Sequence, residues 1–306
     1  MTGYSFTTPV WEDGEWVVPA VTEVTAARMA NGPEDQPRDA PCQWDRIDWR
    51  AQEEQVRRLR QRIFKAAQEG DLAKVRGLQK LMLRSRSNTL LSVRQVTQRN
   101  AGRRAAGIDG EVALTSESRA DVAVRVHQSI RTWKPRAVRR VYIPKASNPA
   151  KLRPLGIPVI LDRCHQARVR NALEPEWEAR FEPKSYGFRP GRSCQDAIGA
   201  IYASCHGPRA QRLWALDADL AAAFDKISHD RLLSAIGSFP AREMIRDWLK
   251  AGVFEPGKGF APTEEGTPQG GLCEAEHKPP YEQCRVMRSA GLLALVTATL
   301  ALERCA

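Results

Sequence analysis

Apolar residues recur at the three-to-four-residue spacing of an α-helix in the stretch that follows Trp44, where ordered structure is expected to begin. They predict one helix that ends at Glu69-Gly70-Asp71 and a second helix directly after it. The positions that carry the pattern are Val56, Leu59, Ile63 and Ala67, then Leu72, Val75, Leu78 and Met82. Farther along, the pattern predicts helices over about 122–133, 162–177 and 229–236.

The period changes after Ala137, where short runs typical of β-strands appear. Residues 141–143 and 155–157 form two such runs, and prolines bound them at positions 144, 154 and 158. They predict a hairpin with a basic tip. A third apolar run, 213–220, reads as a buried strand whose end carries carboxylates. Helices followed by a mixed region of hairpin and helix indicate an α+β fold.

The first 43 residues differ in composition from the rest of the chain. Acidic residues outnumber basic ones there, and Pro9, Pro19, Pro33 and Pro37 interrupt any regular pattern. We predict that residues 1–43 form an acidic, disordered leader. Docking of Trp11 and Trp16 on the main domain is the alternative.

Charge narrows the class of partner. The 306 residues hold 47 Lys and Arg against 36 Asp and Glu, a net charge of +11, and 42% hydrophobic residues are enough for a core. Between Arg50 and Arg104 there are fifteen basic and four acidic residues. A solvated helix face would be favoured if acidic residues alternated with the basic ones. Because they do not, the cations are expected to repel one another unless a polyanion neutralises them. The candidate contacts with such a polyanion are Arg57, Arg58, Arg60, Arg62 and Lys65.

Several classes of protein are disfavoured. No apolar run reaches the roughly 18–20 residues of a membrane span, and no secretory signal opens the chain, so we expect a cytoplasmic protein without a membrane partner. Seven cysteines without a CxxC pair argue against disulfides and a zinc cluster. The glycines of segment 100–110 lack the spacing of a P-loop, which disfavours an ATPase.

Carboxylates at the end of the predicted strand suggest a metal site. Asp217 and Asp219 lie two residues apart and therefore share one face of a strand, and Asp225 follows after a turn. Paired carboxylates suit Mg²⁺, which leaves room for substrate phosphates in two-metal phosphoryl transfer. An isolated Asp-x-Asp is more often a surface or capping feature, so its surroundings must decide.

Those surroundings consist of five motifs in a fixed order. They are Arg139-Arg-Val-Tyr-Ile-Pro-Lys145, Lys151-Leu-Arg-Pro-Leu-Gly-Ile-Pro158 with Asp162-Arg163, Ser185-Tyr-Gly-Phe-Arg-Pro-Gly-Arg-Ser193, Asp217-Ala-Asp-Leu-Ala-Ala-Ala-Phe-Asp225 and Gly266-Thr-Pro-Gln-Gly-Gly271. In these motifs the chain resembles the reverse transcriptases and maturases encoded by group II introns. The resemblance runs from about residue 44 to 271 and includes Gly107-Ile-Asp-Gly110. It implies the fingers and part of the palm of a right-hand polymerase.

The resemblance implies a role for each matching residue near the metal. Asp219 matches the catalytic, metal-binding aspartate, and Leu220 matches the residue whose carbonyl helps to hold Mg²⁺. Phe224 matches the bulky residue that excludes a ribose 2′-hydroxyl, with core packing as its alternative role. Asp217 is either a structural carboxylate or one that supports the metal site from outside.

Other matching residues are implied to hold the nucleotide. Lys145, Arg153 and Arg139 match cations that grip the triphosphate. Arg189, together with Arg192, matches a motif near template and nucleotide, and Gln269 matches the residue that lies against the nascent pair. The implied partners are group II intron RNA, template-primer nucleic acid and dNTPs.

The resemblance also divides the chain. Residues 44–136 correspond to a basic helical N-terminal region, 137–271 to fingers and partial palm, and 272–306 to an atypical tail. The tail brings no Tyr-Ala-Asp-Asp, and no Asp follows Asp247. A truncated or frame-shifted product that is inactive alone is therefore expected, because Asp219 by itself should bind two metal ions poorly.

Two other functions stay open. A non-catalytic RNA-binding remnant would use only the basic N-terminal helices. A helix-turn-helix DNA regulator would leave the motifs at 185–193 and 268–271 unexplained.

Overall fold

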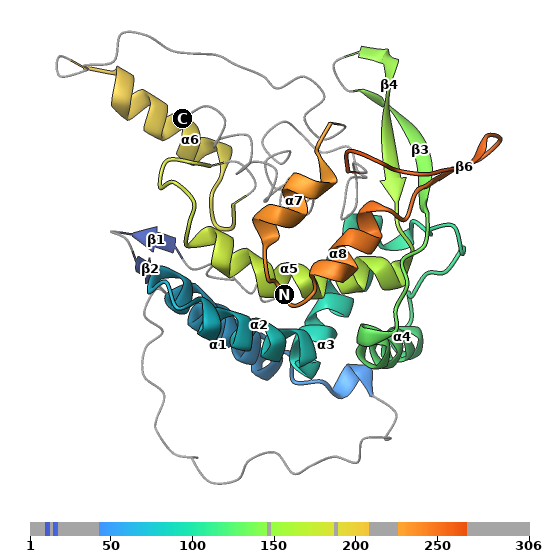
Figure 1. Cartoon of the computed structure of the whole chain (residues 1–306), viewed down its shortest axis with the longest axis horizontal. Coiled ribbons are helices and arrows are strands. Elements are labelled where there is room, and N and C mark those ends of the chain that lie inside the picture. The colour runs from blue at the N-terminus through green and yellow to red at the C-terminus, as the bar shows by residue number, and fades with distance from the viewer. Residues whose placement is uncertain are drawn as a thin grey trace, which may run out of the picture.

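The computed structural model describes residues 10–12, 15–17, 43–145, 148–186, 189–207 and 226–267. These residues form a group of packed helices and a separate mixed sheet (Figure 1). The predicted α+β class is therefore confirmed. No helix in these ranges combines the length and the apolar character that crossing a bilayer requires.

The basic N-terminal region folds into consecutive helices, each of which begins at a capping side chain. They are α1 (Trp49–Gln68), α2 (Leu72–Arg84) and α3 (Arg86–Arg94). The cap carboxylates of Asp48 and Asp71 accept the backbone N–H of Ala51 and Lys74 at 3.1 and 2.9 Å. These bonds satisfy N–H groups that a helix start leaves unpaired. The first two helices confirm the prediction from hydrophobic spacing, including the break at Gly70.

Helix α3 was not predicted because polar residues occupy its buried face. Asn88 is fully buried, and its amide donates to the carbonyls of Met82 at 3.0 Å and Arg168 at 3.2 Å. Such hydrogen bonds offset the cost of burying a polar group. The helix then widens into the π-helical η2 (Gln95–Arg99) and is followed by η3 (Ala101–Arg104).

Helix α5 (Ile160–Glu178) runs through the centre of the helical layer and contacts α1, α2, α3 and α4 (Figure 1). Helix α4 (Ser116–Gln128) and the turn η4 (Ser129–Arg131) occupy the region predicted as a helix over 122–133, so that helix begins earlier than expected. A capping box between Thr115 and Ser118 explains this start. Buried Arg168 of α5 donates to Leu83 O at 2.5 Å and Val126 O at 2.6 Å, which ties α5 to the ends of α2 and α4.

On the other side of α5 lie α7 (His229–Ile236) and α8 (Arg242–Leu249) (Figure 1). Helix α7 has the predicted bounds, whereas α8 was not predicted. Helix α6 (Cys194–Cys205), also unpredicted, buries none of its residues and exposes Ile198, Ile201 and Tyr202.

The sheet has the strand order β4-β3-β5-β6. Its long hairpin, β3 (Val138–Lys145) and β4 (Asn148–Ile157), is antiparallel as predicted. Strand β5 (Val253–Glu255) pairs in parallel with the base of β3, and β6 (Gly259–Ala261) completes an antiparallel hairpin with β5.

Two clusters of buried side chains meet along α5. The first joins α1 and α2 to α7 and α8 through residues such as Ile63, Met82, Leu173 and Leu232. The second joins α3 and α4 to the start of α5 and to Trp44 of η1 (Trp44–Arg46). Because both clusters use α5, the N-terminal helices and the later segments share one continuous core.

Two predictions concern segments of which little is described. Within the predicted leader, β1 (Val10–Glu12) and β2 (Glu15–Val17) pair antiparallel, with Trp11 opposite Trp16, a hairpin that the prediction did not include. The predicted strand at 213–220 and the tail at 272–306 lie outside the described residues.

Candidate nucleic-acid interface

Helix α1 carries the cations that the sequence marks as RNA contacts. Arg58 is 71% exposed, and Arg57, Arg62 and Lys65 are exposed as well. Glu54 accepts from Arg57 Nε at 2.8 Å and from Arg58 Nε at 2.6 Å. The hydrogen bond from Arg57 lowers the pKa of the Glu54 carboxyl and raises the pKa of the Arg57 guanidinium. No ion pair to Arg62 or Lys65 occurs within the described ranges, so these two cations are open to phosphate.

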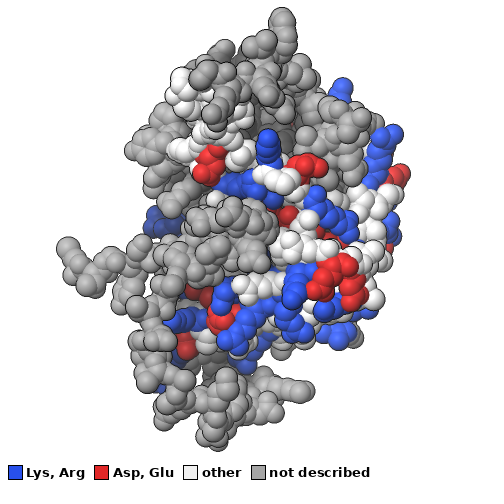
Figure 2. All heavy atoms as spheres, turned by 90° about the vertical axis from the view of Figure 1, so that its left-hand side faces the viewer, with Lys and Arg blue, Asp and Glu red and all other residues white. Residues whose placement is uncertain are grey.

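The expectation that only an external polyanion could offset this charge was wrong in part. Helix α5 supplies two carboxylates to the basic helices: Glu174 accepts from Arg60 Nη1 at 3.0 Å and Glu176 accepts from Arg76 Nη1 at 2.6 Å. Glu53 also pairs with Arg94 and Arg99. Figure 2 shows the result, with Asp and Glu side chains set among the Lys and Arg of this face. Arg60 is thereby placed in a protein ion pair, while Arg62 and Lys65 remain free in the described part of the chain.

The β3–β4 hairpin carries the three cations that match a triphosphate grip. Arg139 is exposed at the base of β3, opposite Ile157, and Arg153 lies opposite Ile143 in the same alternation of the ladder. Residues directly opposite each other share a face, so backbone positions 139 and 153 belong to one face of the hairpin. The backbone of Lys145 lies opposite Asn148, beyond an irregularity at Pro144. The hairpin therefore groups these positions along one ribbon.

Buried Asp162 fastens the base of this hairpin to the helices. Its Oδ1 accepts from the indoles of Trp133 at 2.6 Å and Trp248 at 3.0 Å, and its Oδ2 accepts from Arg136 N at 3.1 Å. Burial raises the pKa of the Asp162 carboxyl, although these donors oppose the shift. The sequence showed Asp162 only as part of a motif; its contacts with α8 and with the entry to β3 required the fold.

The glycine-punctuated loop at 100–110 packs against the start of α5. Arg163 donates to Gly102 O at 3.1 Å and Ala105 O at 2.6 Å. A Cβ at Gly107 would lie 2.6 Å from Val159 Cα, so only glycine permits this approach. These contacts explain the glycine in Gly107-Ile-Asp-Gly110 structurally.

Arg189 and Arg192, in the motif 185–193, form their hydrogen bonds with other groups of the protein. Arg189 is 5% exposed; its Nη2 donates to Glu178 Oε1 at 2.6 Å, and its Nη1 donates to Glu182 O at 2.6 Å and Ser185 O at 3.0 Å. Arg192 donates to the Pro183 carbonyl and lies 5.3 Å from the ring centroid of Tyr186. Through these contacts Arg189 organises the loop of the motif that is expected to lie near template and nucleotide.

Two described segments, one after the Asp219 motif and one at the start of the Gln269 motif, are hydrogen-bonded to each other. Gly266 N donates to Ile227 O at 2.9 Å, and buried His229 Nε2 lies 2.8 Å from Gly266 O. Ile227 follows Asp219 and Asp225 in the chain, and Gly266 is the first residue of the motif that contains Gln269. From the sequence, His229 was predicted only to lie at the start of a helix. No sequence pattern indicated its contact with the Gly266 carbonyl.

Two of the hollows in the described part of the chain bear on the candidate interface. One, of about 660 Å³, lies between the sheet and the segment before Gln269, with Arg140, Tyr142, Glu255 and Thr267 in its lining. Glu255 there accepts from Lys258 Nζ at 2.7 Å and Tyr142 Oη at 3.1 Å, and chiefly the bond from Lys258 lowers the pKa of its carboxyl.

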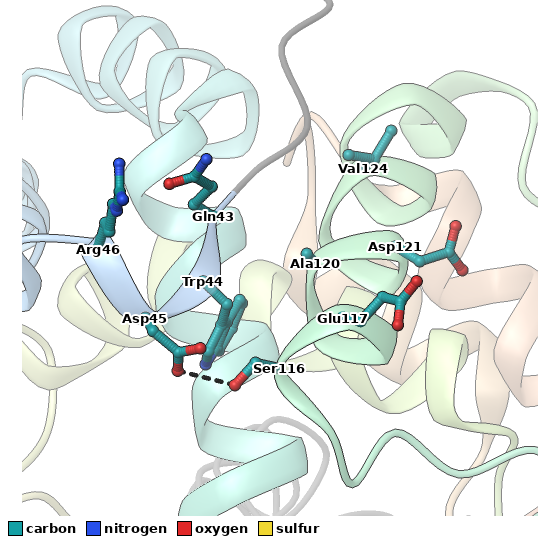
Figure 3. Close-up of a pocket in the computed structure, with 9 residues that line it drawn as sticks. All are labelled: Gln43, Trp44, Asp45, Arg46, Ser116, Glu117, Ala120, Asp121 and Val124. Carbon is teal, nitrogen blue, oxygen red and sulfur yellow. Dashed lines mark hydrogen bonds between the residues drawn. The ribbon is translucent and has the colours of Figure 1, made fainter.

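The other hollow, of about 650 Å³, separates η1 from α4 (Figure 3). Ser116 Oγ donates to Asp45 Oδ1 at 2.7 Å across it, and Glu117 and Asp121 border it. Three carboxylates and one guanidinium, that of Arg46, line it, and this balance of charge disfavours phosphate.

The metal site implied by the sequence lies outside the described residues, as do Asp219, Leu220, Phe224 and Gln269. Within the described ranges, no three His, Cys, Asp or Glu side chains are grouped to hold a metal ion.

Two family profiles match the chain in order. Residues 44–126 match the N-terminal domain of reverse transcriptase, and residues 143–273 match reverse transcriptase (RNA-dependent DNA polymerase). The second match contains the segments of Asp219 and Gln269. The aspartate that lay outside the described structure therefore falls inside a matched reverse-transcriptase domain.

Individual relatives agree with the profiles. The chain is 35% identical over 202 residues to Protein YkfC of Escherichia coli, a match that covers 63% of this chain and 52% of YkfC. It is 39% identical over 154 residues to the group II intron-encoded protein LtrA of Lactococcus lactis, covering 48% of this chain and 25% of LtrA. It is 31% identical over 132 residues to maturase-like protein 1 of Euglena gracilis, covering 43% and 28%.

The chain thus spans about half of YkfC and about a quarter of LtrA and the Euglena protein. Both reverse-transcriptase profiles match in the expected order, and the relatives include group II intron-encoded proteins and maturases. The chain belongs to the group II intron-encoded reverse transcriptase and maturase family.

Proposed function

We propose that this chain binds intron RNA and template-primer nucleic acid as the N-terminal region, fingers and part of the palm of a reverse transcriptase. In this proposal Arg62 and Lys65 contact RNA phosphates, and Arg57 and Arg58 contribute through their exposed sides. The observation that carries it is the unpaired, exposed state of Arg62 and Lys65 on α1 within the described residues, beside cations that the protein pairs internally.

The nucleotide site would be built around the hairpin. Lys145 and Arg153 would neutralise the triphosphate of a dNTP, Arg139 lies farther away at the base of the same hairpin, and Arg189 would shape the adjoining loop. Support comes from the ladder register, which groups positions 139 and 153, and from the Ile227–Gly266 bond, which brings together the flanks of the aspartate and Gln269 motifs. Phe224 and Gln269 would lie against the sugar and the nascent pair.

Asp219 and the Leu220 carbonyl would hold Mg²⁺, which would supply positive charge for the primer 3′-hydroxyl and for the leaving pyrophosphate. The 306 residues contain no Tyr-Ala-Asp-Asp, so Asp219 is the one carboxylate of the implied catalytic set that they supply. We propose that this chain by itself binds nucleic acid but does not extend a primer.

The α1 claim is tested by the salt dependence of RNA binding. Arg62→Ala with Lys65→Ala should lower the affinity for a structured intron RNA, and should reduce the slope of log K against log salt by about 2, or about 1 for each phosphate contact removed. The matched control is Lys134→Ala with Arg246→Ala, which also removes two charges, but from cations that pair with Asp247 and Glu243. It should leave the slope nearly unchanged.

Equal losses in the two double variants would show that binding follows net charge alone, and would contradict the assignment of α1. Equal affinity for intron RNA and for duplex DNA of the same length would favour a DNA-binding helix-turn-helix instead.

A further inference from the structure

The sheet exposes two phenylalanines next to a free cation on one of its faces. Phe254 of β5 and Phe260 of β6 lie directly opposite each other and are 40% and 62% exposed. Arg139 of β3 is the parallel partner of Phe254 in the ladder. Since laterally paired residues lie on the same face, Arg139, Phe254 and Phe260 form a row across three strands.

The Phe260 ring is supported from below by the backbone. A Cβ at Gly252 would lie 2.5 and 2.6 Å from two carbons of this ring, so the ring covers the bare backbone of Gly252, whose φ of +74° also favours glycine. One face of the ring packs against the backbone, which holds the ring in place. The residue is still 62% exposed, so the ring remains accessible.

The charges of the two faces of the sheet differ. On the face of Tyr142 lie Glu255 and, in the adjoining segment, Glu264 and Glu265. On the opposite face the register places Arg139, Val141, Ile143, Leu155, Ile157, Phe254 and Phe260, and none of these described residues is acidic. No ion pair to Arg139 occurs in the described ranges. This face therefore combines aromatic rings with an available positive charge.

We propose that Arg139, Phe254 and Phe260 form a stacking platform for single-stranded nucleic acid. The rings would stack on unpaired bases, and Arg139 would contact the neighbouring phosphate. Stacking tolerates any base, because every base presents a π-face, so the platform would hold a strand without reading its sequence. A single-stranded polynucleotide fits better than an apolar protein partner, because the row ends in an unpaired guanidinium. The proposal rests on the proposed nucleic-acid function but assigns a surface separate from α1.

Binding of a short, fluorescently labelled single-stranded RNA to the full chain tests the platform. Phe260→Ala should weaken binding by about tenfold, as loss of one stacked base predicts, and Phe260→Trp should restore it. Arg139→Ala should reduce the salt slope by about 1, whereas Phe260→Ala should leave the slope unchanged, because it removes no charge. Leu72→Ala and Leu81→Ala, which remove side chains of α2 with 51% and 49% exposure, are the matched controls and should bind as the unmodified chain does.

An oligonucleotide with abasic positions provides the complementary test. It should bind the unmodified chain about tenfold more weakly than the intact oligonucleotide, and Phe260→Ala should no longer distinguish the two. If the unmodified chain binds RNA but Phe260→Ala binds it equally well, the platform fails while the proposed function stands. If the unmodified chain binds no RNA, both fail. A change in sedimentation with Phe260→Ala at unchanged RNA affinity would show that the face joins two protein copies, and would overturn the proposal.

Discussion

At the scale of single residues, Asp162 illustrates a buried charge with a positioning role. Its carboxylate accepts three N–H groups from segments that are far apart in the sequence: Trp133, Arg136 and Trp248. Those contacts join the entry of the hairpin to α5 and α8. An unpartnered carboxylate in this place would cost far more than its hydrogen bonds contribute.

Asp162→Asn tests this role with little change in shape. The amide oxygen can still accept from the two indoles, but the amide nitrogen then faces the N–H of Arg136, and two donors meet. We expect a loss of about 1–3 kcal/mol in the free energy of unfolding, measured by urea denaturation, and faster hydrogen exchange in the β3–β4 hairpin. Asp121→Asn, at a carboxylate that is 62% exposed, should change stability by less than about 0.5 kcal/mol. Similar effects of the two substitutions would contradict the role of Asp162.

His165 should make stability depend on pH. Burial lowers the pKa of this histidine from 6.5 to about 3, and its Nε2 lies 3.2 Å from Ser129 Oγ. As the pH falls below 6.5, the unfolded chain takes up a proton that the folded chain refuses, so stability is lost by up to about 1.4 kcal/mol per pH unit. Asp162, whose pKa is raised, acts in the opposite direction, because the folded chain takes up its proton first.

The contribution of His165 is isolated by comparing urea denaturation of the unmodified chain and His165→Gln between about pH 7 and pH 5. The unmodified chain should lose stability more steeply than the variant, which has no imidazole at this position. Parallel pH profiles would rule out the buried neutral histidine.

At the scale of elements, Arg168 joins three helices. The guanidinium is buried between the Leu83 carbonyl of α2 and the Val126 carbonyl of α4, and burial lowers its pKa to about 10, so it remains charged at neutral pH. Arg168→Met should leave both carbonyls without this donor and cost about 3 kcal/mol or more in unfolding free energy. Arg62→Met, on exposed α1, removes the same charge and should have little effect on stability. Equal stability of the two variants would refute a joining role.

Elements with a clear period were predictable from the sequence, and those without one were not. Ile63 and Met82 belong to regular apolar rows, so α1 and α2 were predicted, and the prolines around β3 and β4 marked the hairpin. Helix α3 buries Asn88 instead of an apolar row, and β5 and β6 have only three residues each, too few for an alternation to be recognised.

The candidate site likewise has residues that the sequence predicted and contacts that it did not predict. Motifs that resemble those of a known family marked Arg139 and Arg153, and the local excess of basic residues marked the α1 cations. The pairing of Arg60 with Glu174 and of Arg76 with Glu176 joins residues about a hundred positions apart, which only the packing of α5 against α1 and α2 reveals. The row of Arg139, Phe254 and Phe260 depends on a parallel strand pair that no local pattern predicts.

At the scale of the whole molecule, a shared core packs the basic helices around α5, and Asp162 of the same helix joins them to the entry of the sheet. A net charge of +11, partly offset by internal carboxylates, leaves cations on α1 and on the hairpin for nucleic acid. In the proposed function these cations bind nucleic acid, and extension of a primer would require Asp219, for which the 306 residues supply no Tyr-Ala-Asp-Asp partner.

Primer extension on an RNA template, with dNTPs and Mg²⁺ and with RNA binding measured in the same samples, tests this account most directly. We expect the purified chain to bind the template-primer in a salt-sensitive manner and to add no nucleotides, and we expect Asp219→Ala to behave identically. Extension that disappears in Asp219→Ala would contradict it, because the chain would then hold a complete metal site.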